Sequence, residues 1–330
     1  MILYYIEDCK SVIWVLLYLD ILSFLWSREI ELPWYAIWMM VFLLYYFSFS
    51  IATIVHNSMH VKTFKNIFFE NIWHFILCFA LGHPVCTYES GHNRSHHRYT
   101  QTEYDVMRTS KMRYKWNFLN LLLFQPTVAF SVFQMDLKFM ISRRSAKDGY
   151  FEKCLLQWIF VIFSQLFLLN LNWRKFLSYV YLPHLFGQWA IVTMNILQHD
   201  GCVISRKNLN GGNDYGKDCG KDCGKDYKYK EYNLARNFTG PVINFLFFNN
   251  GYHTIHHFQP KLHWSKIPTK HAEIEHLIHP NLNEKCMFRY VWKTFIYPGI
   301  RVDYTGNPLQ FKNKEPCDAN WIDEYTNVPG

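Results

Sequence analysis

Four long apolar runs constrain the fold of this chain most strongly. They lie at about residues 11–26, 33–55, 154–170 and 176–197. A bilayer core is roughly 30 Å thick and an α-helix rises about 1.5 Å per residue, so each run can cross or nearly cross a membrane. Half of the 330 residues are hydrophobic, and they concentrate in these runs. The sequence therefore predicts an all-α integral membrane protein with about four transmembrane helices.

The first run has other interpretations, because it is short and carries Asp20. A signal-peptide core or a buried helix has a similar length. Glu7 and Asp8 precede the run, however, and no small-residue cleavage site follows it. We therefore predict that it pairs with the second run as a hairpin across residues 27–32, and that the last two runs form a second hairpin.

Two other apolar stretches, residues 66–82 and 117–135, are interrupted by polar residues or proline. Glu70 lies within the first, and Gln125 and Pro126 lie within the second. We expect these stretches to form helices that lie in the membrane face or are half-buried in the protein.

The distribution of Lys and Arg predicts the orientation, because cytoplasmic loops retain these residues. Residues 61–153 hold 13 of them, and the chain from residue 200 onward holds 17. The two turns on the other side, residues 27–32 and 170–175, hold only three. We therefore expect a multi-pass membrane protein with a helical cap on the cytosolic side.

The whole chain is predicted to be one membrane domain, residues 1–330, with a variable loop at residues 208–229 and a cytosolic tail at residues 281–330. The loop contains a Gly-Lys-Asp repeat that starts at Gly216, and glycine at every fourth position opposes a stable helix. Thiolates at Cys219 and Cys223 are zinc ligands in principle, but the flanking glycines favour a tolerant surface loop.

The net charge of +8 fits this topology and would attract anionic headgroups or an acidic redox partner. Nucleic acid is not an expected partner, because no basic helix or nucleic-acid motif stands apart from the membrane pattern. The nine cysteines form no Cys-x2-Cys pair, so we expect reduced thiols on cytosolic or lipid-facing surfaces.

Four clusters of histidine lie beside the apolar runs, all on the predicted cytosolic side. Their sequences are His56-Asn-Ser-Met-His60, His92-Asn-Arg-Ser-His96-His97, Asn195-Ile-Leu-Gln-His199 and His253-Thr-Ile-His256-His257. Neutral imidazole suits iron, copper, nickel and zinc. Five histidines or fewer would serve one ion, so the nine in these clusters indicate two.

The spacing supports metal binding. Residues four apart lie on one face of a helix, so His56 and His60 can hold one ion or two adjacent ions. In the second and last clusters, a helical pair is joined by a neighbouring histidine that points elsewhere, so each cluster can serve both ions. One His–His pair is often only a surface feature, but four clusters at one membrane face favour a metal site.

The remaining seven histidines are expected to have no metal role. We expect His184, in the middle of the last run, to be a buried histidine with hydrogen-bond partners. The group from His263 to His279 is expected at the cytosolic surface.

The order H-x3-H, H-x3-HH, N-x3-H and H-x2-HH resembles the membrane fatty acid desaturases and hydroxylases. The resemblance covers about residues 35 to 280 and extends to the segments 92–110 and 231–265. It implies that nine histidines hold two ferrous ions and that an asparagine assists through a water. Matched by position, these residues are His56, His60, His92, His96, His97, His199, His253, His256 and His257, with Asn195.

The resemblance implies an enzyme that uses O2 and two electrons to introduce a double bond into a fatty acyl chain. The substrate would be a fatty acyl lipid from the bilayer or an acyl thioester. No His-Pro-Gly-Gly haem motif appears in the sequence, so the expected electron donor is a separate b-type cytochrome or ferredoxin.

Other functions remain open. In the second cluster three residues separate the first two histidines, where many desaturases have two, and related hydroxylases share the longer spacing. A lipid, sterol or carotenoid hydroxylase is therefore the main alternative. A histidine-rich metal transporter fits less well, because the histidines lie at run ends and in loops. A zinc protease is weaker still, because the sequence contains no His-Glu-x-x-His.

Metal-bound histidines usually donate their second N–H to a carboxylate or carbonyl. The candidates near the clusters are Glu103, Asp105, Asp200 and Asn249. Each could equally be a surface or helix-capping residue. Tryptophans such as Trp34 could line an acyl tunnel, but an interfacial aromatic belt explains them better.

Overall fold

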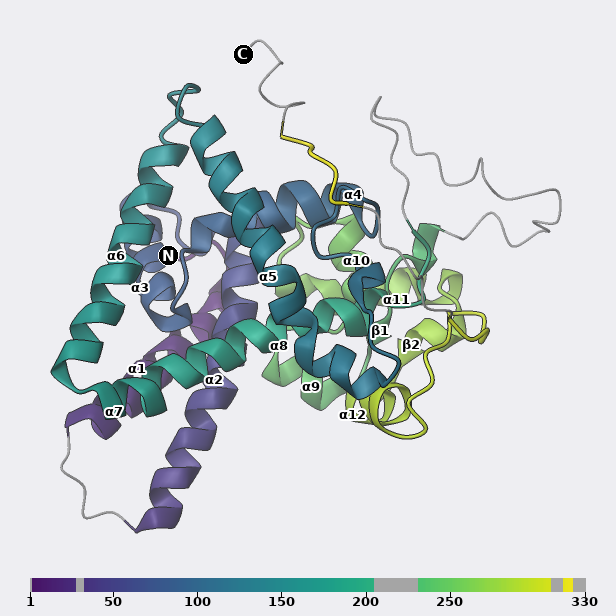
Figure 1. The fold of residues 1–330 in the computed structure, drawn as a ribbon, viewed down its shortest axis with the longest axis horizontal. Helices are drawn as coiled ribbons and strands as arrows, with labels where there is room; N and C mark the ends of the chain where they lie inside the picture. The colour runs from purple at the N-terminus through teal and green to yellow at the C-terminus, as the bar shows by residue number, and fades with distance from the viewer. Residues whose placement is uncertain (1, 28–32, 205–230, 310–316, 323–330) are drawn as a thin grey trace. The chain divides into compact units, whose positions relative to one another are not determined.

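The computed structural model describes residues 2–27, 33–204, 231–309 and 317–322, which form helices joined by turns (Figure 1). The strands in the described ranges are β1 (Asn237–Phe238) and β2 (Asn283–Glu284), which pair in parallel. The predicted all-α fold is confirmed. The chain divides into two compact units, one of residues 1–88 and 143–191, the other of residues 89–142 and 192–330.

Unit 1 holds most of the apolar helices, and three of them begin the chain. Helix α1 packs on α2, and α2 packs on α3, which in turn packs on α6. The elements of this unit are η1 (Ile6–Asp8), α1 (Cys9–Ser27), α2 (Trp34–His60), α3 (Ile67–Leu81), η2 (Val85–Thr87), α6 (Tyr150–Leu171), α7 (Trp173–Lys175), η5 (Phe176–Tyr181) and the first part of α8 (Leu182–His199).

Unit 2 contains one long apolar helix and many short elements that carry histidine. Its elements are η3 (Glu89–His96), α4 (His97–Tyr99), η4 (Thr109–Lys111), α5 (Asn117–Ser142), the end of α8, β1, α9 (Pro241–Leu246), α10 (His253–Phe258), η7 (Trp264–Lys266), α11 (Ile267–Ile274), η8 (Glu275–Leu277), η9 (Pro280–Leu282), β2, α12 (Met287–Val291) and η10 (Trp292–Ile296).

Four helical segments are long and apolar enough to cross a membrane: Ile6–Ser27, Trp34–His60, Asn117–Ser142 and Tyr150–Leu171. Two of them contain the predicted runs 11–26 and 154–170, and Trp34–His60 covers all but the first residue of the run 33–55. The predicted run 176–197 is instead divided between η5, which is π-helical, and α8. Polar residues such as His184 and Gln188 lower the mean hydropathy of α8, whereas α5 keeps a long apolar sequence despite Pro126.

His184 is buried with polar partners, as expected. Its Nε2 atom lies 3.0 Å from the Tyr18 hydroxyl, and its Nδ1 atom lies 3.3 Å from the Gln165 amide nitrogen. The imidazole also lies against Gly82, where a Cβ atom would approach its Nδ1 atom to 2.2 Å. This histidine joins three apolar elements of unit 1 and takes no part in the histidine clusters.

Gly187 allows α8 to lie very close to α2 within unit 1. A Cβ atom at this position would lie 2.7 Å from the Ser48 carbonyl oxygen and 2.9 Å from its carbonyl carbon. Both atoms belong to helix backbone and cannot move away alone. Small residues permit this kind of close approach between apolar helices.

We therefore expect Gly187→Leu to destabilise the protein by about 2 kcal/mol or more, because the two helices must separate. Thermal unfolding in detergent would measure the loss. Leu185→Ala is the matched control on the same helix, because Leu185 is exposed. Equal melting temperatures for both variants would contradict the close packing.

Candidate metal centre

Four histidines of unit 2 converge through their ring nitrogens: His96, His199, His253 and His257. Four such nitrogens, one from each ring, lie within 4.8 Å of one another. The Nε2 atoms of His199, His253 and His257 form a triangle with separations of 3.0, 3.0 and 3.2 Å. Three of the four side chains are buried and His257 is partly buried. We refer to this set as the four-histidine group.

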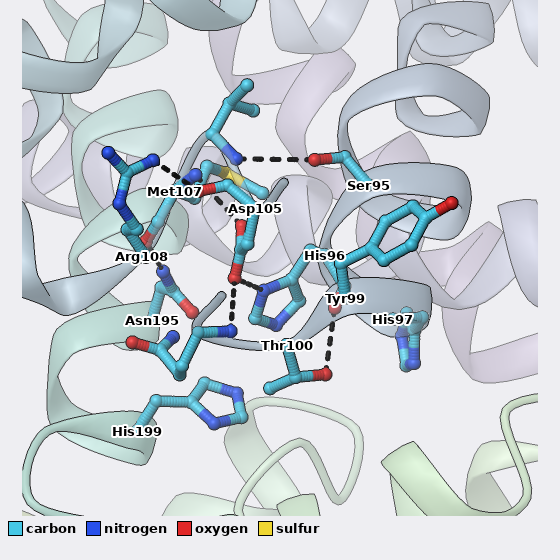
Figure 2. Close-up of polar contacts among 12 residues, drawn as sticks. Ser95, His96, His97, Tyr99, Thr100, Asp105, Met107, Arg108, Asn195 and His199 are labelled. Carbon is cyan, nitrogen blue, oxygen red and sulfur yellow. Dashed lines mark hydrogen bonds and ion pairs between the residues drawn. The ribbon is translucent and has the colours of Figure 1, made fainter. Parts of the chain in front are cut away.

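Hydrogen bonds on the outer side fix the tautomers of two of these rings. The Nδ1 atom of His199 lies 3.0 Å from the Leu234 carbonyl oxygen, which can only accept a hydrogen bond. The Nδ1 atom of His96 lies 2.9 Å from a carboxylate oxygen of Asp105, as Figure 2 shows. Both Nδ1 atoms must therefore carry the proton. In the neutral form of each ring, the Nε2 lone pair is therefore available within the group.

Burial keeps two rings of this group, those of His199 and His257, neutral. It lowers the pKa of His199 to about 3, with a further decrease from neighbouring His96. Burial, followed by the charges of His97, His199, His253 and His96, also lowers the pKa of His257 well below its usual value. Imidazole nitrogens gathered this closely are the arrangement in which several rings can bind one cation. The group therefore fits a divalent transition-metal ion.

A second set in unit 2 contains His92, His97 and His256, which we call the three-histidine group. The Nε2 atom of His97 lies 3.0 Å from that of His92 and 2.9 Å from that of His256. It adjoins the four-histidine group, since the rings of His97 and His257 have centroids 4.4 Å apart. Unit 2 therefore gathers seven histidines in two neighbouring groups.

The local helix geometry decides which histidine joins which group. Residues 89–96 are π-helical, and His92 pairs with His97, five positions later, rather than with His96. His96 points to the four-histidine group instead. On α10, His253 and His257 are one turn apart and serve the same group, while His256 serves the other. The π-helical turn is not visible in a pattern that assumes α-helical spacing.

His56 and His60 lie in unit 1 at the end of α2. Their ring centroids are 5.2 Å apart, and His56 is buried. The H-x3-H spacing therefore places both rings on one face of the last helical turn, as predicted.

Asp105 holds the orientation of His96 and is itself held by the surrounding loop. The Asp105 carboxylate is fully buried and accepts hydrogen bonds from the backbone N–H groups of Gln101 and Met107, each 2.9 Å long. Burial acts to raise the pKa of Asp105, but the charge and hydrogen bond of His96 and the two N–H donors keep it below its usual value. Asp105 is therefore a carboxylate that orients one ring of the four-histidine group, as carboxylates do for metal-binding histidines.

Asn195 lies one turn before His199 on α8 and is buried. Its amide nitrogen donates a hydrogen bond to the Met107 carbonyl oxygen. Among the described residues, its side-chain oxygen has no hydrogen-bond partner. A buried amide oxygen without a partner is costly, so this atom favours a ligand such as water or a metal ion.

The other three candidates from the sequence contact other groups. Glu103 is exposed, Asp200 forms an ion pair with Arg301, and the Asn249 amide donates to the Trp264 carbonyl oxygen. Their position in the sequence, next to histidine clusters, did not distinguish them from Asp105. Asp105 differs from them in its burial and in its two backbone N–H donors, and both features depend on the conformation of the loop.

Two partners of the histidines were not predicted. The Leu234 carbonyl binds His199 but is a backbone group, so no residue type signals it. The Thr100 hydroxyl donates to the His96 carbonyl oxygen and lies 3.5 Å from the Nδ1 atom of His257. It can therefore accept a long hydrogen bond from this ring.

Arg236 clamps the end of α8, where His199 lies. The buried guanidinium donates to the carbonyl oxygens of Leu197 and Asp200, both at 3.1 Å, and stacks 4.3 Å from the Tyr290 ring centroid. A cation at a helix C-terminus also interacts favourably with the helix dipole. This residue was not predicted, although it lies in the 231–265 segment that carries the family resemblance.

We expect Arg236→Met to lower stability by on the order of 3 kcal/mol, because two charged hydrogen bonds are lost and the carbonyls stay buried. Arg236→Lys should lose less, because it retains the charge but not both donors. Thermal unfolding and metal content would be measured together. Wild-type metal content in Arg236→Met would show that the clamp does not position His199.

Two expectations about other side chains are wrong. His263 and His271 are buried rather than at the surface. Cys78, Cys86 and Cys154 are also buried, whereas the sequence predicted thiols at the surface. The cysteines of the described residues are free thiols, as expected. Cys219, Cys223 and the Gly-Lys-Asp repeat lie outside the described residues.

Comparison with known proteins identifies the family. Residues 32–285, well over half of the chain, match the fatty acid desaturase family. The chain therefore belongs to this family of membrane desaturases and hydroxylases, and the resemblance found in the histidine clusters is confirmed. A search of curated proteins gives no match. Membership in the family implies an oxidoreductase.

Proposed function

We propose that this protein is a membrane-bound di-iron oxidoreductase that introduces a double bond into a fatty acyl chain. The observation that carries this proposal is the convergence of histidine ring nitrogens in unit 2, in a chain of the fatty acid desaturase family. Nitrogen ligands without thiolates suit iron, and the family uses a di-iron centre.

The ligands follow from the two groups of unit 2 and from α2. We propose that the four-histidine group binds one iron ion, with Asn195 acting through a water. We propose that the three-histidine group binds the second ion. We propose His56 and His60, the remaining histidines of the ligand set that the sequence predicts, as further iron ligands.

The bound iron ions would supply activation of O2 with two electrons from an external donor. The protein contributes the geometry of the ligands. The hydrogen bonds that the Asp105 carboxylate and the Leu234 carbonyl accept from Nδ1 hold two rings with their Nε2 atoms facing inward. Burial excludes water from the same rings, which protects a reactive oxidant from side reactions.

The substrate and donor are parts of the same proposal. We propose a fatty acyl lipid or acyl thioester as substrate, because the chain belongs to the fatty acid desaturase family and has helices apolar and long enough to cross a bilayer. A separate b-type cytochrome or ferredoxin would supply the electrons. The histidines would face the cytosol, since the Lys and Arg residues favour that side.

Hydroxylation is the second candidate reaction. The H-x3-HH spacing of the second cluster, at His92, His96 and His97, occurs in related hydroxylases and favours this alternative. Both reactions begin with removal of one hydrogen from a methylene group. A double bond results when a second hydrogen leaves, and an alcohol results when oxygen is returned.

Expression of the full chain in a desaturase-deficient host would test the proposal. Mass spectrometry of the lipids should show fatty acyl products that have lost two hydrogens. A gain of one oxygen would establish the hydroxylase instead. Neither product, from a protein that is present in the membrane and contains iron, would overturn the proposed reaction.

A further inference from the structure

Helix α5 of unit 2 has one face buried in protein and one face that is apolar and exposed. Its buried residues include Phe124, Val128, Met135 and Phe139. The exposed apolar residues recur at helical spacing on the other side: Phe130, Phe133, Leu137 and Ile141. A soluble helix would carry polar residues on its outer face.

A second exposed apolar row follows β2 in the same unit. Phe288, Trp292 and Ile296 occupy every fourth position of α12 and η10 and are 72%, 56% and 40% exposed. Basic residues alternate with them, since Lys285, Arg289 and Lys293 are exposed as well. Aromatic residues beside Lys and Arg are typical of segments at the boundary between lipid headgroups and acyl chains.

The second row adjoins the first turn of α5, because η10 packs on this helix. The Asn117 amide donates a 2.6 Å hydrogen bond to the Thr294 carbonyl oxygen, and both residues are buried. Trp116, just before α5, is 61% exposed and adds a further interfacial residue there. We call this surface, formed by the exposed residues of α5, α12 and η10, the apolar face of unit 2.

Both ends of α5 are attached to elements that carry histidines. At its far end, Asp136 accepts a hydrogen bond from Ser90, and the Arg94 guanidinium lies 5.4 Å from the Phe139 ring centroid. Ser90 and Arg94 belong to η3, which carries His92 and His96.

The near end of α5 is tied to α10 through the small sheet. The segment that contacts Asn117 follows β2, and β2 pairs with β1. Asn237 of β1 then donates to the Thr254 hydroxyl on α10, between His253 and His256.

Both ends of α5 are therefore tied to parts of unit 2 that lead to histidines. A helix of 26 residues is about 39 Å long, so a helix that crossed the bilayer would have these two ends on opposite sides of the membrane.

The charges agree with a position along the membrane surface. Arg113 and Lys115 precede α5, while Lys138 lies near its end and Arg143 and Arg144 follow directly. Basic residues concentrate on the cytoplasmic side of membrane helices. A crossing α5 would therefore place one basic group on the wrong side.

We propose that α5 lies in the plane of the membrane and that the apolar face of unit 2 docks on an anionic lipid leaflet. The partner is the lipid surface itself: acyl chains meet the apolar row, and headgroup phosphates meet the basic residues. This inference concerns unit 2 alone and stands apart from the proposed reaction. Docking of the apolar face would keep the seven histidines of unit 2 attached to a lipid surface.

Photolabelling of the full chain would test this placement. The protein is reconstituted in vesicles of phosphatidylcholine and phosphatidylglycerol that contain a carbene precursor either near the headgroup or at the acyl-chain end. Mass spectrometry then locates the labels. We expect the shallow probe to label Phe130, Leu137 and Trp292 several-fold more than α11. The deep probe should label α6 but not α5.

Two outcomes would overturn the proposal. Equal labelling of α5 and α6 by the deep probe would show that α5 crosses the membrane. Lack of labelling by both probes would show that water or another protein covers this face.

A variant tests the anchor residues directly. The triple variant Phe288→Glu, Trp292→Glu and Ile296→Glu should reduce shallow labelling near Asn117 several-fold. The control variant adds the same charges at the exposed positions of Thr269, Ala272 and His276 and should label as wild type. Size-exclusion chromatography and cobalt binding would confirm that both variants fold. Unchanged labelling in the folded triple variant would count against the anchor.

Discussion

Replacing His96 with alanine is expected to abolish product formation and to lower bound iron, because the four-histidine group loses one of four converging nitrogens. Removing a group that merely orients a metal ligand already costs about 10- to 100-fold in metal affinity or activity. Loss of the ligand itself should exceed this range. The protein should remain in the membrane, since the apolar helices are untouched.

The measurements are product analysis in a desaturase-deficient host and iron content of the purified protein. His276→Ala is the control, because His276 is exposed and lies outside both groups. The control should retain product and iron. Retained product in the His96 variant would contradict the role of the four-histidine group in the reaction.

The membrane helices follow from the sequence to the extent that local composition decides them. The run at residues 33–55 becomes α2, and the run at 154–170 becomes α6, because long apolar sequences without charges favour one structure. The run at 176–197 was less predictable. His184 forms a hydrogen bond with the Tyr18 hydroxyl, and the Gln188 amide donates one to the Leu81 carbonyl oxygen. Both partners lie in distant parts of the chain, which local composition does not indicate.

The converging histidines were predictable as a set of residues but not as an arrangement. Spacing alone identified them and predicted that His56 and His60 share one face, but it did not say which rings of the last cluster do so. The division between His96 and His97 depends on the π-helical turn at Glu89–His96, which spacing does not show. The burial of His263 and His271 likewise depends on packing between α10, η7 and α11.

The partners of the histidines were the least predictable part. Glu103 and Asp105 are two positions apart in the sequence, and both are carboxylates near a histidine cluster. Only the fold distinguishes them: Asp105 is turned inward by hydrogen bonds from Gln101 and Met107, while Glu103 is exposed. Gln101 has a left-handed backbone, with φ of 67°, at the turn that produces this arrangement.

The different surroundings of Asp105 and Glu103 can be tested by mutation. Asp105→Asn keeps the size of the side chain but removes its charge, so His96 loses the carboxylate that holds its Nδ1 proton and increases the basicity of Nε2. We expect iron affinity to fall by about 10- to 100-fold, with a similar loss of activity. Titration of the apoprotein with ferrous or cobaltous ions would measure the affinity separately from activity.

Glu103→Gln is the matched control, because it removes the same charge two positions away from a side chain that contacts no histidine ring. It should bind metal as tightly as the wild type. Asp105→Ala should bind metal more weakly than Asp105→Asn, since the amide oxygen can still accept a hydrogen bond from Nδ1 of His96. Equal affinity in the Asn and Gln variants would mean that the carboxylate does not control His96, and that burial alone orients the ring.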